Sequence, residues 1–91
     1  MEQRLLSRVT RKFNSRRAPE CKAKVVFQRD GVLCIEFSGT KASFACCFDE
    51  NFVDYQYYLK DITGKDFSLQ KIERKRAEKF RVFYEEVRKD G

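Results

Sequence analysis

The sequence predicts an α+β fold in which helices pack on one face of a small antiparallel sheet. Two observations carry this prediction. Residues 2–15 place apolar side chains at helical spacing, and three later runs alternate apolar and polar residues with turn residues between them. The predicted order of elements is α-β-β-β-α-α, with the three strands forming a meander.

The first helix is predicted over residues 2–15. Its apolar positions fall on one side when successive residues are turned by about 100°. Pro19 follows a few residues later and disfavours helical backbone in the residue before it, so an extended segment should come next. The residues on the apolar side are Leu5, Leu6, Val9 and Phe13.

Three short runs, at residues 22–28, 32–38 and 42–48, alternate apolar and polar side chains as half-buried strands do. Glycine-containing turns separate them, at residues 29–31 and at 39–40. Short turns of this kind join antiparallel neighbours. The runs therefore predict a three-stranded meander.

The register of the first hairpin depends on its turn. A two-residue turn at positions 30–31 pairs Gln28 with Leu33, which mixes polar and apolar residues on each face. A three-residue turn with a glycine bulge instead pairs Phe27 with Leu33 and makes one face apolar throughout. We favour the three-residue turn, which places Phe27 in the core.

Two further segments follow the strands. Asp49 is a suitable N-cap for a helix from Glu50 to Ile62. The segment from about Ser68 to Lys89 is rich in helix-forming residues and fits one long helix, which we favour. The alternative is a β-hairpin with strands FSLQKIERK and KFRVFYEEV, which would give a five-stranded sheet.

Length and composition predict one small basic domain over residues 1–91. The chain is 42% hydrophobic and 37% charged, as globular domains are. No apolar run approaches the roughly 20 residues that span a bilayer, and the arginine-rich start lacks the apolar stretch of a signal peptide. We therefore expect a cytoplasmic protein without membrane contact.

The four cysteines include an adjacent pair in the stretch FACCFDE, at residues 44–50. Neighbours in a strand point to opposite faces, so Cys46 and Cys47 cannot readily share a metal ion. Cys34 lies diagonally from Cys47 at about 7–8 Å, beyond ordinary disulfide reach. The chain has no histidine and no C-x-x-C motif, so we expect reduced thiols, no metal and no cofactor.

Catalytic groups are also scarce. Without histidine the chain lacks the commonest acid-base group at neutral pH, and every Cys-His or Ser-His nucleophile is excluded. The glycine-rich loops that hold nucleotide phosphates are absent. We therefore expect no enzymatic activity and no small-molecule substrate.

The net charge of +6 is unevenly distributed along the chain. Residues 1–24 carry +6, residues 25–64 carry −3, and residues 65–91 carry +3. Arginines spaced by one helical turn can meet successive phosphates. We expect a small non-catalytic accessory domain that binds nucleic acid, RNA in preference to DNA, through Arg4, Arg8, Arg11, Lys12, Arg16, Arg17, Lys22 and Lys24.

The alternative function is a protein-interaction or homodimerisation module. One face of the predicted meander carries small, mildly apolar residues ringed by polar ones and has no helix over it. Such a face suits a protein partner or a second copy of the chain. The predicted interface residues are Val26, Val32, Cys34, Ala45 and Cys47.

The predicted opening order α-β-β-β-α, with KAKVVFQRDGVLCIEF at residues 22–37, resembles two RNA-binding folds. These are the double-stranded-RNA-binding domain and the small Alu-domain subunits of the signal recognition particle, whose first hairpin is similar to this stretch. The stretch covers about a fifth of the chain. The chain departs from the former fold by lacking a G-P-x-H loop and by the extra helix at 50–62. The resemblance implies RNA as the ligand and transfers no functional residue.

Overall fold

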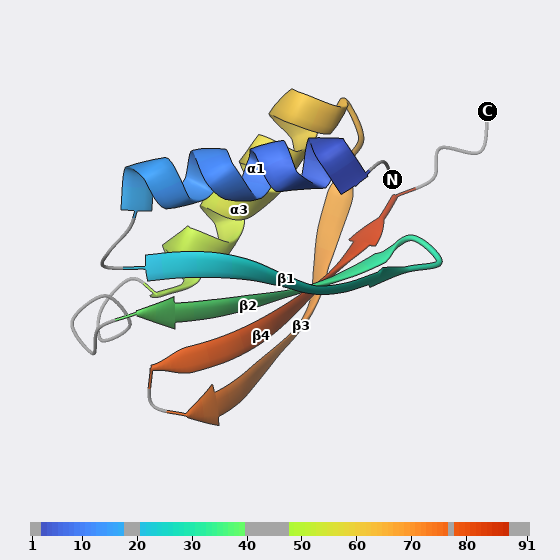
Figure 1. The fold of residues 1–91 in the computed structure, drawn as a ribbon. Coiled ribbons are helices and arrows are strands. Elements are labelled where there is room, and N and C mark those ends of the chain that lie inside the picture. Colours follow the sequence, from blue (N-terminus) through green and yellow to red (C-terminus); the bar gives the residue numbers. More distant parts are fainter. Residues whose placement is uncertain (1–2, 18–20, 40–47, 77, 88–91) are drawn as a thin grey trace.

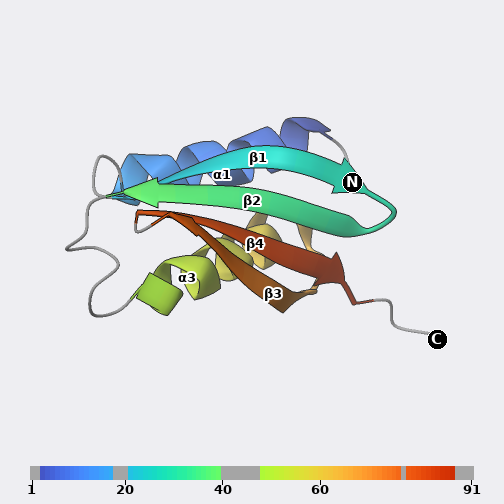
Figure 2. The same cartoon turned by 90° about the horizontal axis from the view of Figure 1, so that it is seen from below.

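In the part of the chain that the structure describes, four strands form one antiparallel sheet, and two helices lie on the same face of it (Figure 1, Figure 2). The computed structural model describes residues 3–17, 21–39, 48–76 and 78–87. The strand order is β1-β2-β4-β3, so two sequence-local hairpins meet at the central β2–β4 pair. The elements are α1 (Gln3–Arg17), β1 (Cys21–Arg29), β2 (Val32–Gly39), α3 (Phe48–Thr63), β3 (Phe67–Arg76) and β4 (Lys79–Glu86).

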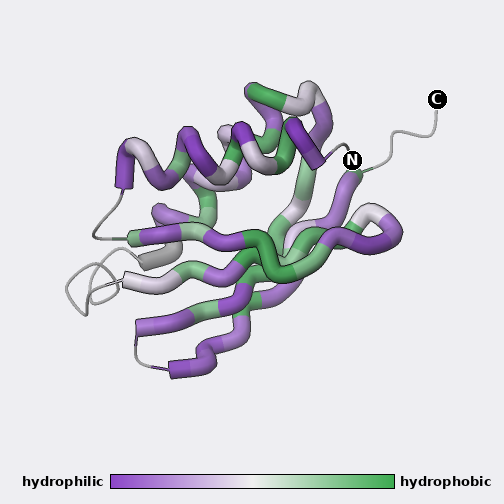
Figure 3. The backbone as a smooth tube through the Cα atoms, in the orientation of Figure 1, coloured by the Kyte–Doolittle hydropathy of each residue, from purple (hydrophilic) through white to green (hydrophobic). Residues whose placement is uncertain are grey.

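The core lies between the helices and the sheet and is rich in aromatic side chains. The ring of Phe13 on α1 meets Phe37 on β2 edge to face, with centroids 5.5 Å apart. The Tyr84 hydroxyl donates a hydrogen bond of 2.7 Å to the carbonyl oxygen of Phe52, which fixes β4 to α3. Green segments in Figure 3 mark hydrophobic residues on strands beneath the helices.

The two helices divide the sheet between them. α1 packs along β1, whereas α3 packs against α1 and β3 (Figure 1). The helices run antiparallel, because Arg17 at the end of α1 pairs with Asp54, while Lys12 lies over the ring of Tyr58 further along α3. The opposite face of the sheet, called here the open face, has no helix over it (Figure 2).

The first hairpin corrects the predicted register close to the turn. Asp30 and Gly31 have φ of 51° and 80°, so a two-residue turn of the I′ kind joins β1 to β2. It pairs Gln28 with Leu33, and the predicted pairing of Phe27 with Leu33 is wrong. A register shift between Val25 and Phe27 leaves residue 26 without a partner.

Beyond this bulge the predicted register is confirmed. Val25 pairs with Ile35 and Ala23 with Phe37, so the inner half of β1 turns its apolar residues toward the helices. Phe27 pairs with Cys34 on the other side of the bulge. Its ring therefore lies on the open face, not in the core as predicted.

The last segment is a β-hairpin, so the favoured long helix is wrong and the alternative hairpin is confirmed. The sheet of the described residues has four strands, however, and not the five that this alternative implied. β4 pairs with β3 and also with β2, where Phe37 faces Phe80 and Ile35 faces Val82. These pairs bury a continuous apolar stripe beneath the helices. That long-range burial outweighs the helix propensity of residues 70–79.

The fold class is confirmed as α+β with an antiparallel sheet and helices on one face. The predicted order is wrong, because the observed order is α-β-β-α-β-β. The observed order also differs from the α-β-β-β-α order on which the resemblance to RNA-binding folds rests. Residues 42–47 of the predicted third strand lie outside the described residues, and β4 takes its predicted place beside β2. The predicted helix 50–62 is confirmed as α3, which begins at Phe48, so Asp49 lies inside the helix.

Candidate nucleic-acid interface

α1 carries the densest net positive charge among the described elements. The helix contains six basic residues and no acidic one. Its buried stripe of Leu6, Val9 and Phe13 faces the core, which turns the intervening positions to solvent. Six of the eight predicted contact residues lie on α1. Arg17 is half-buried, and the other five are exposed: Arg4, Arg8, Arg11, Lys12 and Arg16.

On β3 and β4, three basic residues are paired with acidic neighbours. Glu73 pairs with Lys71 at 2.9 Å and with Lys75 at 3.4 Å, and hydrogen bonds from these ammonium groups lower the pKa of its carboxyl. Arg81 lies 3.4 Å from Glu36 across the β2–β4 pair. The basic run of β3 thus forms a mixed-sign surface.

On α1 the charges are mostly not compensated. Arg17 is held by Asp54 of α3, and the ammonium of Lys12 lies 5.4 Å from the ring centroid of Tyr58. Within the described part of the chain, no ion pair holds the remaining four arginines. These are Arg4, Arg8, Arg11 and Arg16.

Two surface hollows flank α1, and Arg11 lines both. The first, the α3-side hollow, lies between α1 and the end of α3 and measures about 390 Å³. Three of its five lining residues are cationic, so a phosphate placed there would meet several positive groups. The lining residues are Arg8, Arg11, Lys12, Ser15 and Ile62.

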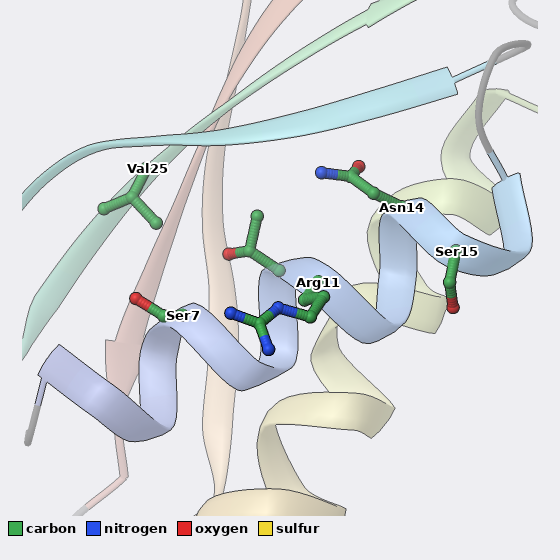
Figure 4. Close-up of a pocket in the computed structure, with 6 residues that line it drawn as sticks. Ser7, Arg11, Asn14, Ser15 and Val25 are labelled. Carbon is green, nitrogen blue, oxygen red and sulfur yellow. The ribbon is translucent and has the colours of Figure 1, made fainter.

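The second, the β1-side hollow, lies between α1 and the edge of β1 and measures about 590 Å³. Asn14 reaches from α1 toward β1 (Figure 4), donating to the Ala23 carbonyl at 3.1 Å and accepting from the Ala23 N–H at 2.7 Å. These two bonds fix the distance between helix and strand. The lining residues are Ser7, Thr10, Arg11, Asn14, Ser15 and Val25.

Lys22 and Lys24 do not join the α1 surface. Side chains alternate along β1, and Cys21 and Ala23 are buried beneath the helices. Both lysines are exposed and therefore lie on the open face. The predicted eight-residue footprint is thus divided between two faces of the molecule.

The predicted protein interface also changes when it is placed on the structure. Val26 is the bulged residue and is 38% exposed, and Val32 is half-buried. Cys34 lies on the open face but is only 1% exposed, so it is not available as a contact residue. Ala45 and Cys47 lie outside the described residues.

Two of the cysteines are described, and both are buried free thiols. Burial raises the pKa of Cys21 to about 11, although the nearby Arg17 opposes the shift. Burial also raises the pKa of Cys34. A raised thiol pKa suppresses the reactive thiolate, so neither group has the character of a nucleophile.

Phe27 and Phe83 are exposed or half-exposed rings on the open face that the sequence analysis did not place there. The three-residue turn placed Phe27 in the core, and the favoured long helix left Phe83 outside the sheet. Strict alternation in KFRVFYEE, where Phe80, Val82 and Tyr84 are apolar, is the signal that would have placed Phe83 opposite the core.

The described residues contain neither a metal-binding cluster nor a helix suited to span a membrane. No group of three or more His, Cys, Asp or Glu residues within the described ranges is arranged to hold a metal ion. Neither described helix combines the length and the apolar character needed to cross a bilayer.

Comparison with known proteins finds no matching protein family and no matching solved structure. Part of the chain is 44% identical, over 41 residues, to an uncharacterized Nudix hydrolase of Listeria monocytogenes serovar 1/2a. The matched segment covers 45% of this chain and 24% of that protein. The chain therefore corresponds to about a quarter of the length of the curated relative that it matches.

This match contradicts the prediction that the chain is not an enzyme, because the matched protein is named a hydrolase. The prediction relied on the missing histidine and the missing phosphate-binding loops. Catalytic groups of a longer protein need not lie in the part that one segment matches. Their absence from these 91 residues is therefore no argument against a relation to an enzyme.

Proposed function

We propose that this chain binds nucleic acid, RNA in preference to DNA, by contacting phosphates with the basic side chains of α1. The observation that carries the proposal is the uncompensated charge of this helix. It has six basic residues and no acidic one, and four of its arginines take part in no ion pair within the described ranges.

The spacing of the arginines supports contact with more than one phosphate. Arg4, Arg8 and Arg11 follow one another at one-turn intervals and span about 10 Å of helix. Guanidinium groups bind phosphate oxygens in a bidentate manner and remain charged at every physiological pH. A strand lying along α1 would meet these groups in succession.

The α3-side hollow gives the helix a second way to hold a phosphate. Arg8, Arg11 and Lys12 line it together, so an anion there gains from three cations. Contacts of this kind carry no sequence information, and we expect binding that varies little with base sequence.

The test is fluorescence anisotropy with labelled RNA and DNA oligonucleotides, single and double stranded. We expect micromolar or tighter binding that weakens about tenfold or more between roughly 50 and 200 mM salt, because phosphate contacts release counterions. Replacing Arg8→Gln and Arg11→Gln together should weaken binding to all sequences alike. It should also reduce the salt slope by about 1.4 for a single strand.

The matched control is Lys60→Gln with Lys65→Gln, which removes the same charge from α3 and the loop after it, where the two lysines pair with Asp66 and Glu86. It should change affinity less than the α1 variant. Equal losses in the two variants, or no binding at low salt, would show the proposal to be wrong. Electrophoresis of the recovered oligonucleotide should accompany the titration, since the match to a named hydrolase makes its integrity worth measuring.

A further inference from the structure

Phe27 and Phe83 form an aromatic pair in the middle of the open face. Their ring centroids are 6.0 Å apart and the ring planes are inclined by 56°. The two residues belong to β1 and β4, which lie on either side of β2. Strands two places apart are separated by about 9.6 Å, so the rings lean toward each other over β2.

The residue beneath the rings explains why they are held in place. Cys34 of β2 stands between Phe27 and Phe83 in the same row of the sheet. It is 1% exposed although it lies on the uncovered face, because the two rings cover it. The outer surface of the pair remains accessible, and Phe27 is 39% exposed.

Basic residues lie on both sides of Phe27 along β1. Lys22 and Lys24 precede Phe27 on the open face and Arg29 follows it, so one side of the strand carries two cations, a ring and another cation. β1 contains no acidic residue, and none of the ion pairs among the described residues involves these three cations. On the far side, Lys71 lies 6.0 Å from the Phe83 centroid.

We infer that Phe27 and Phe83 form a platform on which unpaired bases of a single nucleic-acid strand stack, with the cations of β1 contacting the adjoining phosphates. Every base has a flat face that can stack on an aromatic ring, and a phosphate follows each base at short distance. The alternation of cations and an aromatic ring along β1 matches this alternation of phosphates and bases. The inference rests on the proposed nucleic-acid-binding function but concerns a different surface from α1.

The charges favour this ligand over a second copy of the chain. Two chains paired face to face through β1 would bring Lys22, Lys24 and Arg29 close to the same cations of the partner. Like charges in such positions repel. The phosphates of a nucleic acid can pair with the cations of β1, and its bases can stack on the exposed aromatic rings.

The test uses a single-stranded RNA containing 2-aminopurine, whose fluorescence reports stacking, and a duplex of the same sequence. Phe27→Leu keeps an apolar cover over Cys34 but removes the ring, so the fold should persist, as circular dichroism will check. We expect single-strand affinity to fall about 5- to 100-fold with an unchanged salt slope, because no charge is altered. Phe27→Tyr restores a ring and should restore binding.

The matched control is Tyr57→Leu, which removes a ring that is 65% exposed on α3, away from the open face. It should leave binding and the fluorescence change as in the unmodified chain. If RNA binds but Phe27→Leu has no effect, or Tyr57→Leu has the same effect, the platform is wrong while the proposed function stands.

Two other outcomes would also overturn the platform. If no oligonucleotide binds at low salt, both the platform and the proposed function are wrong. If sedimentation shows self-association that Phe27→Leu abolishes and RNA does not disturb, the open face is a protein interface. In contrast, a reduced salt slope in the Arg8→Gln and Arg11→Gln variant, with the fluorescence change retained, would support two separate contact surfaces.

Discussion

Asn14 is the residue that joins α1 to the edge strand. Its side-chain amide makes two hydrogen bonds to the backbone of Ala23, one as donor and one as acceptor. Replacing Asn14→Ala leaves both backbone groups of Ala23 without these partners in a partly buried place. We expect the free energy of unfolding to fall by about 1–3 kcal/mol, measured by urea denaturation.

Ser15→Ala is the control for this change. Its hydroxyl donates to the Lys12 carbonyl within the same helix and is exposed, so water can replace the bond. The loss of stability should be clearly smaller than for Asn14→Ala. Equal losses would mean that the Asn14 bonds do not contribute to the packing of α1 on β1.

Cys21 makes the stability of the protein sensitive to alkaline pH. Its pKa is raised by burial from an ordinary value of 9.0 to about 11. Between these values the thiol loses its proton in the unfolded state and keeps it in the folded state. The unfolded state then binds fewer protons, so the free energy of unfolding should fall as pH rises from 9 toward 11.

The measurement is a series of urea titrations between pH 8 and 11 on the unmodified chain and on Cys21→Ala. The variant should lose part of this pH dependence, because one titrating group is removed. The decline that remains comes from Cys34, Tyr55 and Tyr84, whose pKa values are also raised by burial, with the tyrosines acting at the upper end. Identical slopes in the two proteins would contradict the assignment to Cys21.

At the scale of elements, the β1–β2 turn depends on a glycine with positive φ. Gly31 has φ of 80°, and a Cβ added there would meet nothing closer than the Cβ of Glu86 at 3.9 Å. The expected penalty of Gly31→Ala is therefore conformational, about 1–2 kcal/mol, rather than steric. Thermal unfolding should show Gly31→Asn to be less damaging, since asparagine enters this backbone region more readily.

Register shifts account for two of the errors in the predicted elements. In β1 the bulge reverses which face Phe27 occupies, although the pairs nearer the start of the strand agree with the prediction. In β3 a register shift between Leu69 and Lys71 separates the apolar residues Leu69 and Ile72 by three positions instead of two. A spacing of three is typical of a helix, so the periodicity indicated the wrong element.

The helices and the first hairpin are the parts of the fold that the sequence does predict. Both helices and the first hairpin have regular patterns, and the predicted segments for them agree with the observed elements to within a few residues. The β2–β4 pair joins residues about 45 positions apart in the chain. Local pattern contains no information about such a partner, which is why residues 42–48 were assigned its place.

The whole molecule separates two kinds of charged surface. Mixed charges and ion pairs cover β3 and β4, while positive charge alone occupies α1 and β1. Because α1 lies along β1, the basic residues of both elements lie near the same edge of the sheet (Figure 1). The sequence indicates the basic residues, but only the fold assigns Lys22 and Lys24 to a different face from the arginines of α1.

Stability of the whole molecule depends on the second hairpin. β4 pairs with β2 through Leu33, Ile35 and Phe37, all of which are fully or almost fully buried. A fragment ending at residue 66 would expose this edge and remove Phe67, Phe80, Val82 and Tyr84 from the core. We expect no cooperative thermal transition from that fragment and binding of a hydrophobic dye; a native-like transition would show that the first half folds alone.

The bulge in β1 also bears on how related chains can differ in length. The eight β1–β2 pairs omit Val26, and the two-residue turn fixes Arg29 opposite Val32. A chain without residue 26 would keep every one of these partners, whereas a chain with one residue more would require a second irregularity. In this strand we therefore expect relatives to be one residue shorter rather than one residue longer. The shorter strand would keep its buried residues beneath the helices and its basic residues on the open face.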